Sequence, residues 1–278
     1  MSLTSNFFIH TDASLLKFEG NDVFDLFNRL STNNIETNQD DAITTTIFTN
    51  ENGRCIDVVS VWSMKNNTAL VESSSSNKEI LVSWIEKYII EEDVKIFNRD
   101  DSAVLSIFNT TRTLNINIPE FDDILENKPV HMQISGVNVL ASKHSFFNGH
   151  ECIKIIFPNN LESCQILKFF LMERKIEELD DDQFESFRIA NLIPRSGKEI
   201  TTEFNPLELN LYDYIDFNKG CYIGQEVIAR LDTYDKVQRV MKLLHSRKDS
   251  SIVENKGCTI TSNKDPYLIG VVRKKILS

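Results

Sequence analysis

The sequence contains few of the residues that break regular structure or cross-link a chain. It has 278 residues, of which only 9 are glycine, 6 are proline and 5 are cysteine. So little glycine and proline argues against a fibrous or low-complexity protein, and 41% hydrophobic with 26% charged residues is ordinary for a globular one. A chain of this length can bury a large core, in one domain or in two to three packed units.

The five cysteines are few, odd in number and far apart, and no two form a C-x-x-C pair. They are Cys55, Cys152, Cys164, Cys221 and Cys258. This pattern predicts reduced thiols rather than a disulfide framework. Most of them are expected to be small apolar core residues. The five histidines show no i, i+4 pairing and no nearby pair of cysteines, so we expect no metal site.

Long apolar runs are missing as well. No run approaches the ~20 residues that span a bilayer, and the start Met-Ser-Leu-Thr-Ser lacks the basic and apolar regions of a signal peptide. We therefore expect a cytoplasmic protein that makes no membrane contact. The signatures G-x-G-x-x-G, G-K-[ST], H-E-x-x-H and G-x-S-x-G are also absent, which disfavours nucleotide hydrolysis and zinc proteolysis.

Basic residues are outnumbered by acidic ones. Lys and Arg total 30 against 41 for Asp and Glu, which gives a formal net charge of -11. Such a field repels nucleic acid and anionic lipid, so neither is an expected partner. Screening confines each charge to roughly 10 Å, so a local basic pocket can still bind a small anion. The acidic sequence, poor in apolar patches, predicts a monomer.

Helical and strand patterns are mixed along the chain without strict alternation. Helices are expected at 22–30, 77–90, 163–179, 181–192 and 225–231, and strands at 43–49, 55–63, 94–97, 104–108, 137–142, 152–157, 240–245, 258–261 and 267–272. The turn signal at 50–53 joins the first two strands into a hairpin. In the second helix the residues expected to face inward are Ile80, Leu81, Trp84, Ile85, Tyr88 and Ile89. The mixture predicts an α+β fold with antiparallel sheets flanked by helices.

The stretch 187–230 concentrates polar and special residues with little apolar periodicity, which usually indicates function or a demanding loop. Within it, KGCYIGQE places the ammonium of Lys219 beside the thiol of Cys221, and Gly224 permits a tight entry into a helix. A nearby ammonium and a helix N-terminus both lower the pKa of a cysteine, which favours a reactive thiolate at Cys221. On spacing alone, a packed cysteine in a turn is an equally good interpretation.

The segment KGCYIGQEVIAR resembles the signature of the YgfZ family of folate-binding proteins, within the wider superfamily of the glycine-cleavage T-protein. RIANLIP and NPLELNL upstream, and FNRLSTNNI and ENGRCIDVV nearer the amino end, are similar to the same family in the same order. The resemblance covers most of residues 15–245. It implies a T-protein-like fold of three sub-domains around a central channel that binds tetrahydrofolate or a one-carbon derivative. It also implies a role in assembly or repair of iron-sulfur enzymes, with those enzymes or assembly proteins as partners.

The resemblance assigns roles only where residues match. Matching positions are Lys219, Gly220, Cys221, Tyr222, Gly224, Gln225 and Glu226 in the signature, with Arg188 and Pro194 upstream. A pterin needs apolar walls with a few placed polar groups, and its glutamate tail needs a cation. The residues expected at the folate site are Arg188, Tyr222, Gln225, Glu226, Asp57 and Arg195. For the arginines the alternative is structural, because a helical arginine usually covers apolar surface or pairs with a carboxylate. We expect Cys221 to act as a redox or transfer thiol that Lys219 tunes.

Two departures weaken an assignment to aminomethyl transfer. T-proteins carry an acidic residue where this chain has Ala190, and a second aspartate where Val58 follows Asp57. Transfer of a methylene group from a protein-bound amine needs a positioned carboxylate, so a standard aminomethyltransferase is not the expected enzyme. The leading hypothesis is a tetrahydrofolate-binding accessory protein for iron-sulfur enzymes. An aminomethyltransferase and a noncatalytic interaction scaffold are the alternatives.

Three regions are expected along the chain. They are an N-terminal α+β folate-binding region at 1–110, a second α+β region with the RIANLIP and KGCYIGQE motifs at 111–233, and a short C-terminal β region at 234–278. Only 48 residues follow Arg230, so the β-barrel that the resemblance implies would be abbreviated.

Overall fold

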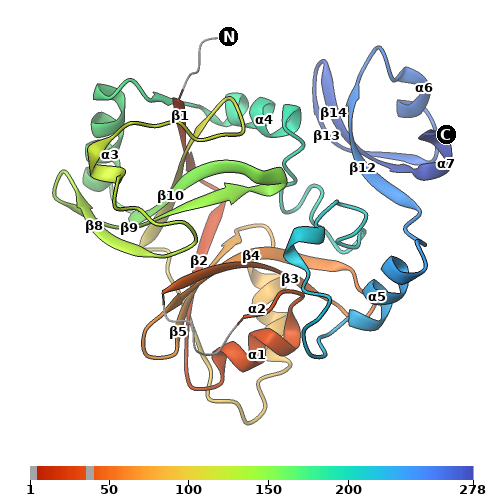
Figure 1. Ribbon diagram of the computed structural model, residues 1–278, viewed down its shortest axis with the longest axis horizontal. Helices are drawn as coiled ribbons and strands as arrows, with labels where there is room; N and C mark the ends of the chain where they lie inside the picture. The colour runs from red at the N-terminus through yellow and green to blue at the C-terminus, as the bar shows by residue number, and fades with distance from the viewer. Residues whose placement is uncertain (1–4, 36–40, 278) are drawn as a thin grey trace.

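The computed structural model describes residues 5–35 and 41–277, and its three β-sheets lie at three corners of the molecule (Figure 1). The strand orders are β11-β1-β7-β10-β9-β8, β3-β4-β5-β2-β6 and β12-β14-β13. All pairings are antiparallel except that of β1 with β11. The structure thus confirms the expected α+β class with antiparallel sheets.

The five-stranded sheet carries two helices on one face. Its strands are β2 (Ala13–Glu19), β3 (Ala42–Thr49), β4 (Cys55–Met64), β5 (Thr68–Ser74) and β6 (Lys95–Asn98). Helices α1 (Val23–Leu30) and α2 (Lys78–Glu86) pack their apolar sides onto it. The other face of the central strand β4 is covered too, which explains why nine consecutive residues of that strand are buried.

The six-stranded sheet combines the first strand of the chain with strands from its middle. Its members are β1 (Ser5–His10), β7 (Ser102–Asn109), β8 (Val130–Ile134), β9 (Val137–Phe146), β10 (His150–Pro158) and β11 (Glu177–Glu178). Helix α3 (Leu161–Glu173) packs on this sheet through Leu167, Phe170 and Leu171. Helix α4 (Asp181–Ala190) starts with a capping box between Asp180 and Gln183. Short 3-10 turns, η1 (Pro119–Phe121) and η2 (Phe147–Gly149), complete this part.

The third sheet follows helix α5 (Gln225–Thr233) and consists of β12 (Arg239–His245), β13 (Cys258–Lys264) and β14 (Tyr267–Arg273). Two short helices accompany it, α6 (Ser250–Val253) and α7 (Lys274–Leu277). The short C-terminal β region expected at 234–278 stays a prediction as a domain. The boundaries at 110 and 233 stay predictions.

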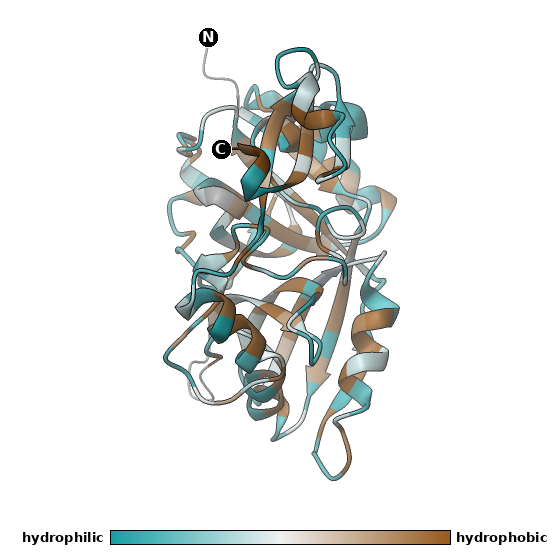
Figure 2. Cartoon of the chain, turned by 90° about the vertical axis from the view of Figure 1, so that its right-hand side faces the viewer, coloured by the Kyte–Doolittle hydropathy of each residue, from teal (hydrophilic) through white to brown (hydrophobic). Residues whose placement is uncertain are grey.

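The segment 191–224 runs between the three sheets (Figure 1). It has little regular structure apart from η3 (Tyr212–Tyr214), yet it buries Ile200, Phe204, Leu207, Leu209 and Leu211 in one core with residues of β4 and β12. The segment therefore joins the sheets through a shared core. Along the chain as a whole, apolar residues gather on the strands while the connecting loops are mostly hydrophilic (Figure 2).

Two sequence predictions about helices were wrong in part. The helix expected at 163–179 ends at Glu173, because Lys175 takes a positive φ of 61° and the chain then forms β11. The helix expected at 77–90 ends at Glu86, and Ile80 is 55% exposed instead of facing inward. None of the described helices is long and apolar enough to cross a membrane.

Candidate functional site

A cavity of ≈ 140 Å³ lies where the two larger sheets meet the chain that follows α4. Phe146, Phe147 and Phe184 form an aromatic wall, and Phe184 stacks on Phe8 with ring centroids 3.9 Å apart. Polar side chains from five strands and two loops face it as well: His10, Asp12, Thr45, Ser60, Glu72, Ser73, Lys154, Arg195 and Ser196. An aromatic wall with convergent polar groups is typical of a small-ligand site.

A buried ion pair crosses this cavity from one large sheet to the other. Lys154 of β10 donates to both carboxylate oxygens of Glu72 of β5, each at 2.8 Å, and their side chains are only 10% and 13% exposed. Burial by itself would raise the pKa of Glu72, but the positive charge and hydrogen bonds of Lys154, with smaller contributions from His10 and His144, together outweigh it and the pKa is lowered. The pair is therefore held in its charged form inside the protein.

Two imidazoles stand beside this ion pair. His10 Nε2 lies 2.8 Å from Ser106 Oγ, and burial lowers the pKa of His10 to about 4. Burial, helped by Lys154, lowers the pKa of His144 to about 3. Both rings are therefore neutral near pH 7, so each has one nitrogen that donates and one that accepts.

Asp57 lies beneath the cavity floor and is fully buried. Its carboxylate accepts from Ser73 Oγ at 2.5 Å, Ser196 Oγ at 2.6 Å and Asn77 Nδ2 at 3.1 Å. Burial raises the pKa of Asp57, and these hydrogen bonds oppose the rise. Because Ser73 and Ser196 give their protons to Asp57, their oxygens can offer only lone pairs to a ligand. The floor is therefore built to receive hydrogen-bond donors.

The two arginines expected at the folate site both line this cavity, but their guanidinium groups are occupied. Arg188, only 1% exposed, binds Glu185, Glu199 and Ser262. Arg195 binds Asp12 at 2.9 Å and Glu185 at 3.1 Å. Arg188 therefore ties α4 to β13, and Arg195, which is half-buried, keeps some reach toward the cavity.

The ammonium of Lys219 caps the C-terminal end of α1. Its Nζ donates to the backbone oxygens of Asn28, Ser31 and Asn33 at 2.6–3.0 Å, and Asn28 Oδ1 lies at 3.1 Å. It also lies 5.6 Å from the ring centroid of Tyr222. Burial lowers the pKa of Lys219 to about 8. Lys219 thus fastens the signature segment to α1 through carbonyls that the helix leaves unpaired.

The rest of the signature lies against the β3–β4 hairpin. Gly224 has a φ of 85°, and a Cβ there would lie 2.6 Å from the backbone oxygen of Asn50, so only glycine fits this close approach. Thr49 Oγ1 donates to the backbone oxygen of Ile223 at 2.6 Å. The expected tight entry into helix 225–231 is confirmed, with α5 two residues longer.

The predicted site residues therefore fall into two groups. Asp57, Arg188 and Arg195 lie at the cavity, whereas the signature residues lie outside its lining. In the signature, Cys221 is exposed, Tyr222 is buried in the core that the hairpin shares, and Gln225 and Glu226 open α5. Burial raises the pKa of Tyr222 to about 12, so its hydroxyl stays protonated. The roles assigned to these residues stay predictions.

Sequence reasoning missed His10, Glu72 and Lys154, which supply the charged and imidazole groups of the cavity. They come from three strands that are distant in the sequence, so spacing gives no sign that they meet. One local signal existed: Lys154 interrupts the apolar run 152–157, and a lysine buried in such a strand needs a partner.

All five cysteines are free, and burial raises the pKa of Cys152 to about 12 and also raises that of Cys55. Those two thiols are therefore held protonated, whereas Cys221 is exposed. Within residues 5–35 and 41–277, no group of three or more His, Cys, Asp or Glu side chains could hold a metal ion.

Comparisons with known proteins place this geometry in a family context. A chloroplastic protein of Arabidopsis thaliana, whose name assigns it only provisionally to the transferases, is 26% identical over 230 residues, 81% of this chain and 52% of that protein. A mitochondrial Dictyostelium discoideum protein, named as a homolog of the iron-sulfur cluster assembly factor IBA57, is 25% identical over 268 residues, 85% of this chain and 62% of that protein. An aminomethyltransferase of Caldanaerobacter subterraneus is 24% identical over 220 residues, 76% of this chain and 58% of the enzyme.

A solved structure shows the fold. The glycine cleavage system aminomethyltransferase T of Bartonella henselae superposes with a TM-score of 0.76 at 12% identity, covering 98% of this chain and 79% of that one. The architecture is therefore the T-protein fold. The chain spans only 52% to 62% of the length of the three curated relatives. A model of the GCVT N-terminal domain matches residues 10–219, most of the chain, and the protein therefore belongs to the GCVT N-terminal domain family.

Proposed function

We propose that the cavity between the two larger sheets, called the central cavity below, binds the pterin ring of a reduced folate. We also propose that the protein is an accessory factor for assembly or repair of iron-sulfur enzymes. The observation that carries the folate part is the floor formed by Ser73 and Ser196. Their hydroxyls are committed to Asp57, so they accept hydrogen bonds from a ligand. The amide-like edge of a pterin presents N–H and amino donors, which match such a floor.

The walls of the cavity fit a flat heteroaromatic ring. Phe146, Phe147 and Phe184 supply apolar contact, and Glu72 with neutral His10 adds acceptors on the polar side. The volume of ≈ 140 Å³ lies below the ~300 Å³ at which sites for larger ligands begin. The cavity therefore suits one ring system, and the benzoyl-glutamate part of a folate would extend beyond it.

The iron-sulfur part rests on the relative from Dictyostelium discoideum, whose name gives it a role in iron-sulfur cluster assembly, and on the exposed thiol of Cys221. An exposed thiol held between two anchors, Lys219 and Gly224, is accessible to a large partner. We propose that Cys221 meets an iron-sulfur client or assembly protein, for which the cluster is cargo. The proposed compartment is the cytoplasm, and the proposed state is a monomer.

Calorimetric titration with tetrahydrofolate under anaerobic conditions tests the folate site. Asp57→Asn should weaken binding about tenfold or more, because an asparagine amide no longer orients both serine hydroxyls. Lys219→Ala, outside the cavity lining, should leave the affinity unchanged. If Lys219→Ala weakens binding and Asp57→Asn does not, the ligand lies beside the signature and the cavity assignment is wrong. Absence of binding by the parent protein would leave a scaffold role.

Complementation of an iron-sulfur-enzyme defect tests the thiol. Cys221→Ser should abolish complementation while tetrahydrofolate affinity is retained. Cys164→Ser, which changes a thiol that is only partly exposed, is the matched control and should complement fully. Full activity of Cys221→Ser would remove the essential-thiol role but would leave the folate site standing.

A further inference from the structure

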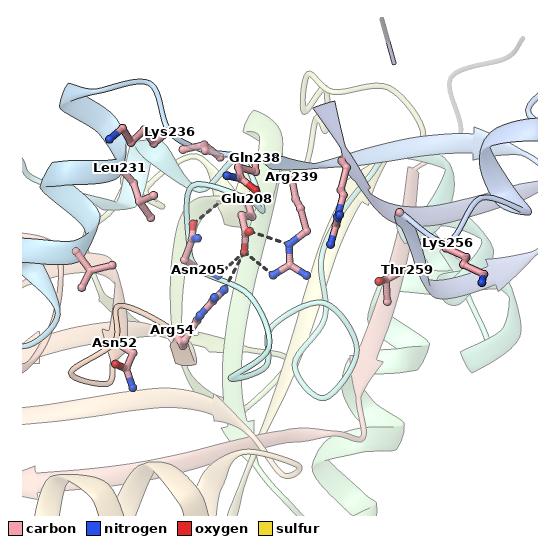
Figure 3. Close-up of a pocket in the computed structure, with 14 residues that line it drawn as sticks. Asn52, Arg54, Asn205, Glu208, Leu231, Lys236, Gln238, Arg239, Lys256 and Thr259 are labelled. Carbon is pink, nitrogen blue, oxygen red and sulfur yellow. Dashed lines mark hydrogen bonds and ion pairs between the residues drawn. The ribbon is translucent and has the colours of Figure 1, made fainter. Parts of the chain in front are cut away.

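A second, larger cleft lies between the β3–β4 hairpin, helix α5 and the three-stranded sheet (Figure 3). Its volume of ≈ 400 Å³ falls in the ~300–1,000 Å³ range of small-ligand sites. Asn52 and Arg54 come from the hairpin, Leu231 from α5, and Arg239 and Thr259 from the sheet. None of its lining residues lines the central cavity, so this cleft is separate from the proposed folate site.

The charge of this cleft is opposite to that of the whole protein. Five cationic residues line it against one carboxylate, although the chain as a whole carries -11. The cations are Arg54, Lys236, Arg239, Lys256 and Arg273, and the carboxylate is Glu208. Lys236 and Lys256 lie at opposite edges of the cleft (Figure 3). Glu203, outside the lining, lies 3.8 Å from Arg239 and offsets one more charge, so three positive charges remain uncompensated.

Glu208 is part of the framework and does not oppose an anionic ligand. It is 5% exposed, and its oxygens accept from Arg54 at 3.1 Å, from Arg239 at 2.8 and 3.1 Å, and from the backbone N–H of Asn205 at 3.0 Å (Figure 3). Arg239 also lies over the ring of Phe204, 4.9 Å from its centroid. These contacts fix two guanidinium groups in place while leaving other N–H donors on each.

The other three cations lack a carboxylate partner. In the part of the chain that the structure describes, Lys236, Lys256 and Arg273 form no ion pair within 4 Å. A surface ion pair contributes little to stability, so a single unpaired cation at the surface is ordinary. Three unpaired cations that gather around one cleft are available to an anion from outside the protein.

We propose that this cleft binds a small molecule carrying two linked phosphate groups. One phosphate group carries about 1.5 to 2 negative charges near pH 7, so two phosphates are enough to match the three uncompensated positive charges. Guanidinium forks suit phosphate oxygens, and the side chains of Asn52, Gln238 and Thr259 add neutral donors. Among the described residues that line the cleft none is aromatic, so recognition falls on the phosphates instead of a base. The inference stands independently of folate binding.

Titration of the full chain with inorganic pyrophosphate tests this site, with citrate as a carboxylate of similar charge. Pyrophosphate should bind, and Lys256→Ala/Arg273→Ala should weaken it about tenfold or more. Lys95→Ala/Lys128→Ala, which removes two exposed lysines outside the cleft, is the charge-matched control and should leave the affinity for pyrophosphate unchanged. Added salt should weaken the parent protein's affinity.

Three results would overturn the proposal: no pyrophosphate binding, equal affinity in the double variant, or citrate binding as tightly as pyrophosphate. Both substituted side chains are exposed, so urea midpoints of the ligand-free variants should match the parent. Lys236→Ala, also exposed and on the opposite edge, repeats the test if the double variant is unstable.

Discussion

The ion pair between Lys154 and Glu72 gives the sharpest test of the central cavity. Replacing Lys154 with methionine keeps most of the side-chain volume but leaves the Glu72 carboxylate buried without its cation. Breaking a buried pair from one side costs roughly 3 to 5 kcal/mol, whereas replacing both partners is often close to neutral. Since both side chains keep a little exposure at the cavity, we expect Lys154→Met to lose about 3 kcal/mol at pH 7.

The loss should depend on pH in a defined direction. In the parent protein the pKa of Glu72 is lower in the folded state than in the unfolded chain. Glu72 therefore stabilises the fold at a pH above its unfolded-state pKa, and this stabilisation is lost as the pH falls through its folded-state pKa. Without Lys154, burial raises that pKa, so the carboxyl takes up a proton near neutral pH. The difference in free energy of unfolding between Lys154→Met and the parent protein should therefore become smaller as the pH falls from 7 toward 4.

Urea unfolding of a double-mutant cycle measures these effects. Lys154→Met/Glu72→Gln should recover most of the stability that Lys154→Met loses, because no charge then remains buried. A loss below about 1 kcal/mol in Lys154→Met, or a double variant that loses the sum of both single changes, would show that the pair is not a buried, coupled unit. Tetrahydrofolate binding should not recover with stability in the double variant if Glu72 contacts the ligand.

Three other predictions concern single residues. The pKa of His10 in the folded protein, about 4, lies below its value in the unfolded chain, so the unfolded chain binds the extra proton and stability falls as the pH drops from about 6.5 to 4. His10→Gln should make thermal unfolding midpoints depend less on pH over this range. An unchanged dependence would contradict the lowered pKa of His10. Lys219→Met should lose about 1 to 3 kcal/mol in urea unfolding, because the carbonyls at the end of α1 lose their donor, whereas a neutral effect would show that water replaces it. Gly224→Ala should lose about 1 to 2 kcal/mol or more from its positive φ and the close backbone oxygen of Asn50, and a stable variant would mean that the turn relaxes.

Much of the fold could be predicted from periodicity, because several elements present one apolar face. Helix α1 was expected within one residue of its observed start, since Val23, Phe24, Phe27 and Leu30 repeat at helical spacing and all are buried. The strands β1, β2, β5, β8 and β11 were missed. Polar residues such as His10 in β1 and buried Ser73 in β5 line the cavity, where alternation would place apolar side chains, so the pattern that marks a half-buried strand is broken there.

The site was harder to predict than the fold, because its contacts join residues distant in the sequence. Arg188 was expected to hold folate, but its partners include Glu199 and Ser262, and the latter lies 74 residues away. A local motif indicates that a residue is important, but it does not reveal which neighbouring groups the side chain binds in the folded protein. Gly224 is the contrasting case, since its turn is local and its conformation was foreseen from the following helix.

The positions of the cavity and of Cys221 constrain how these two candidate sites can act together. Thr45 and Ser60 of the β3–β4 hairpin line the cavity, while Thr49 at the end of β3 holds the segment that carries Cys221. The hairpin therefore supports both sites, yet Cys221 is exposed and lies outside the cavity lining. Direct group transfer would need reacting atoms about 3 to 3.5 Å apart. Because Cys221 lies outside the cavity lining, the accessory function that we propose involves two separate binding events, one at the cavity and one at Cys221.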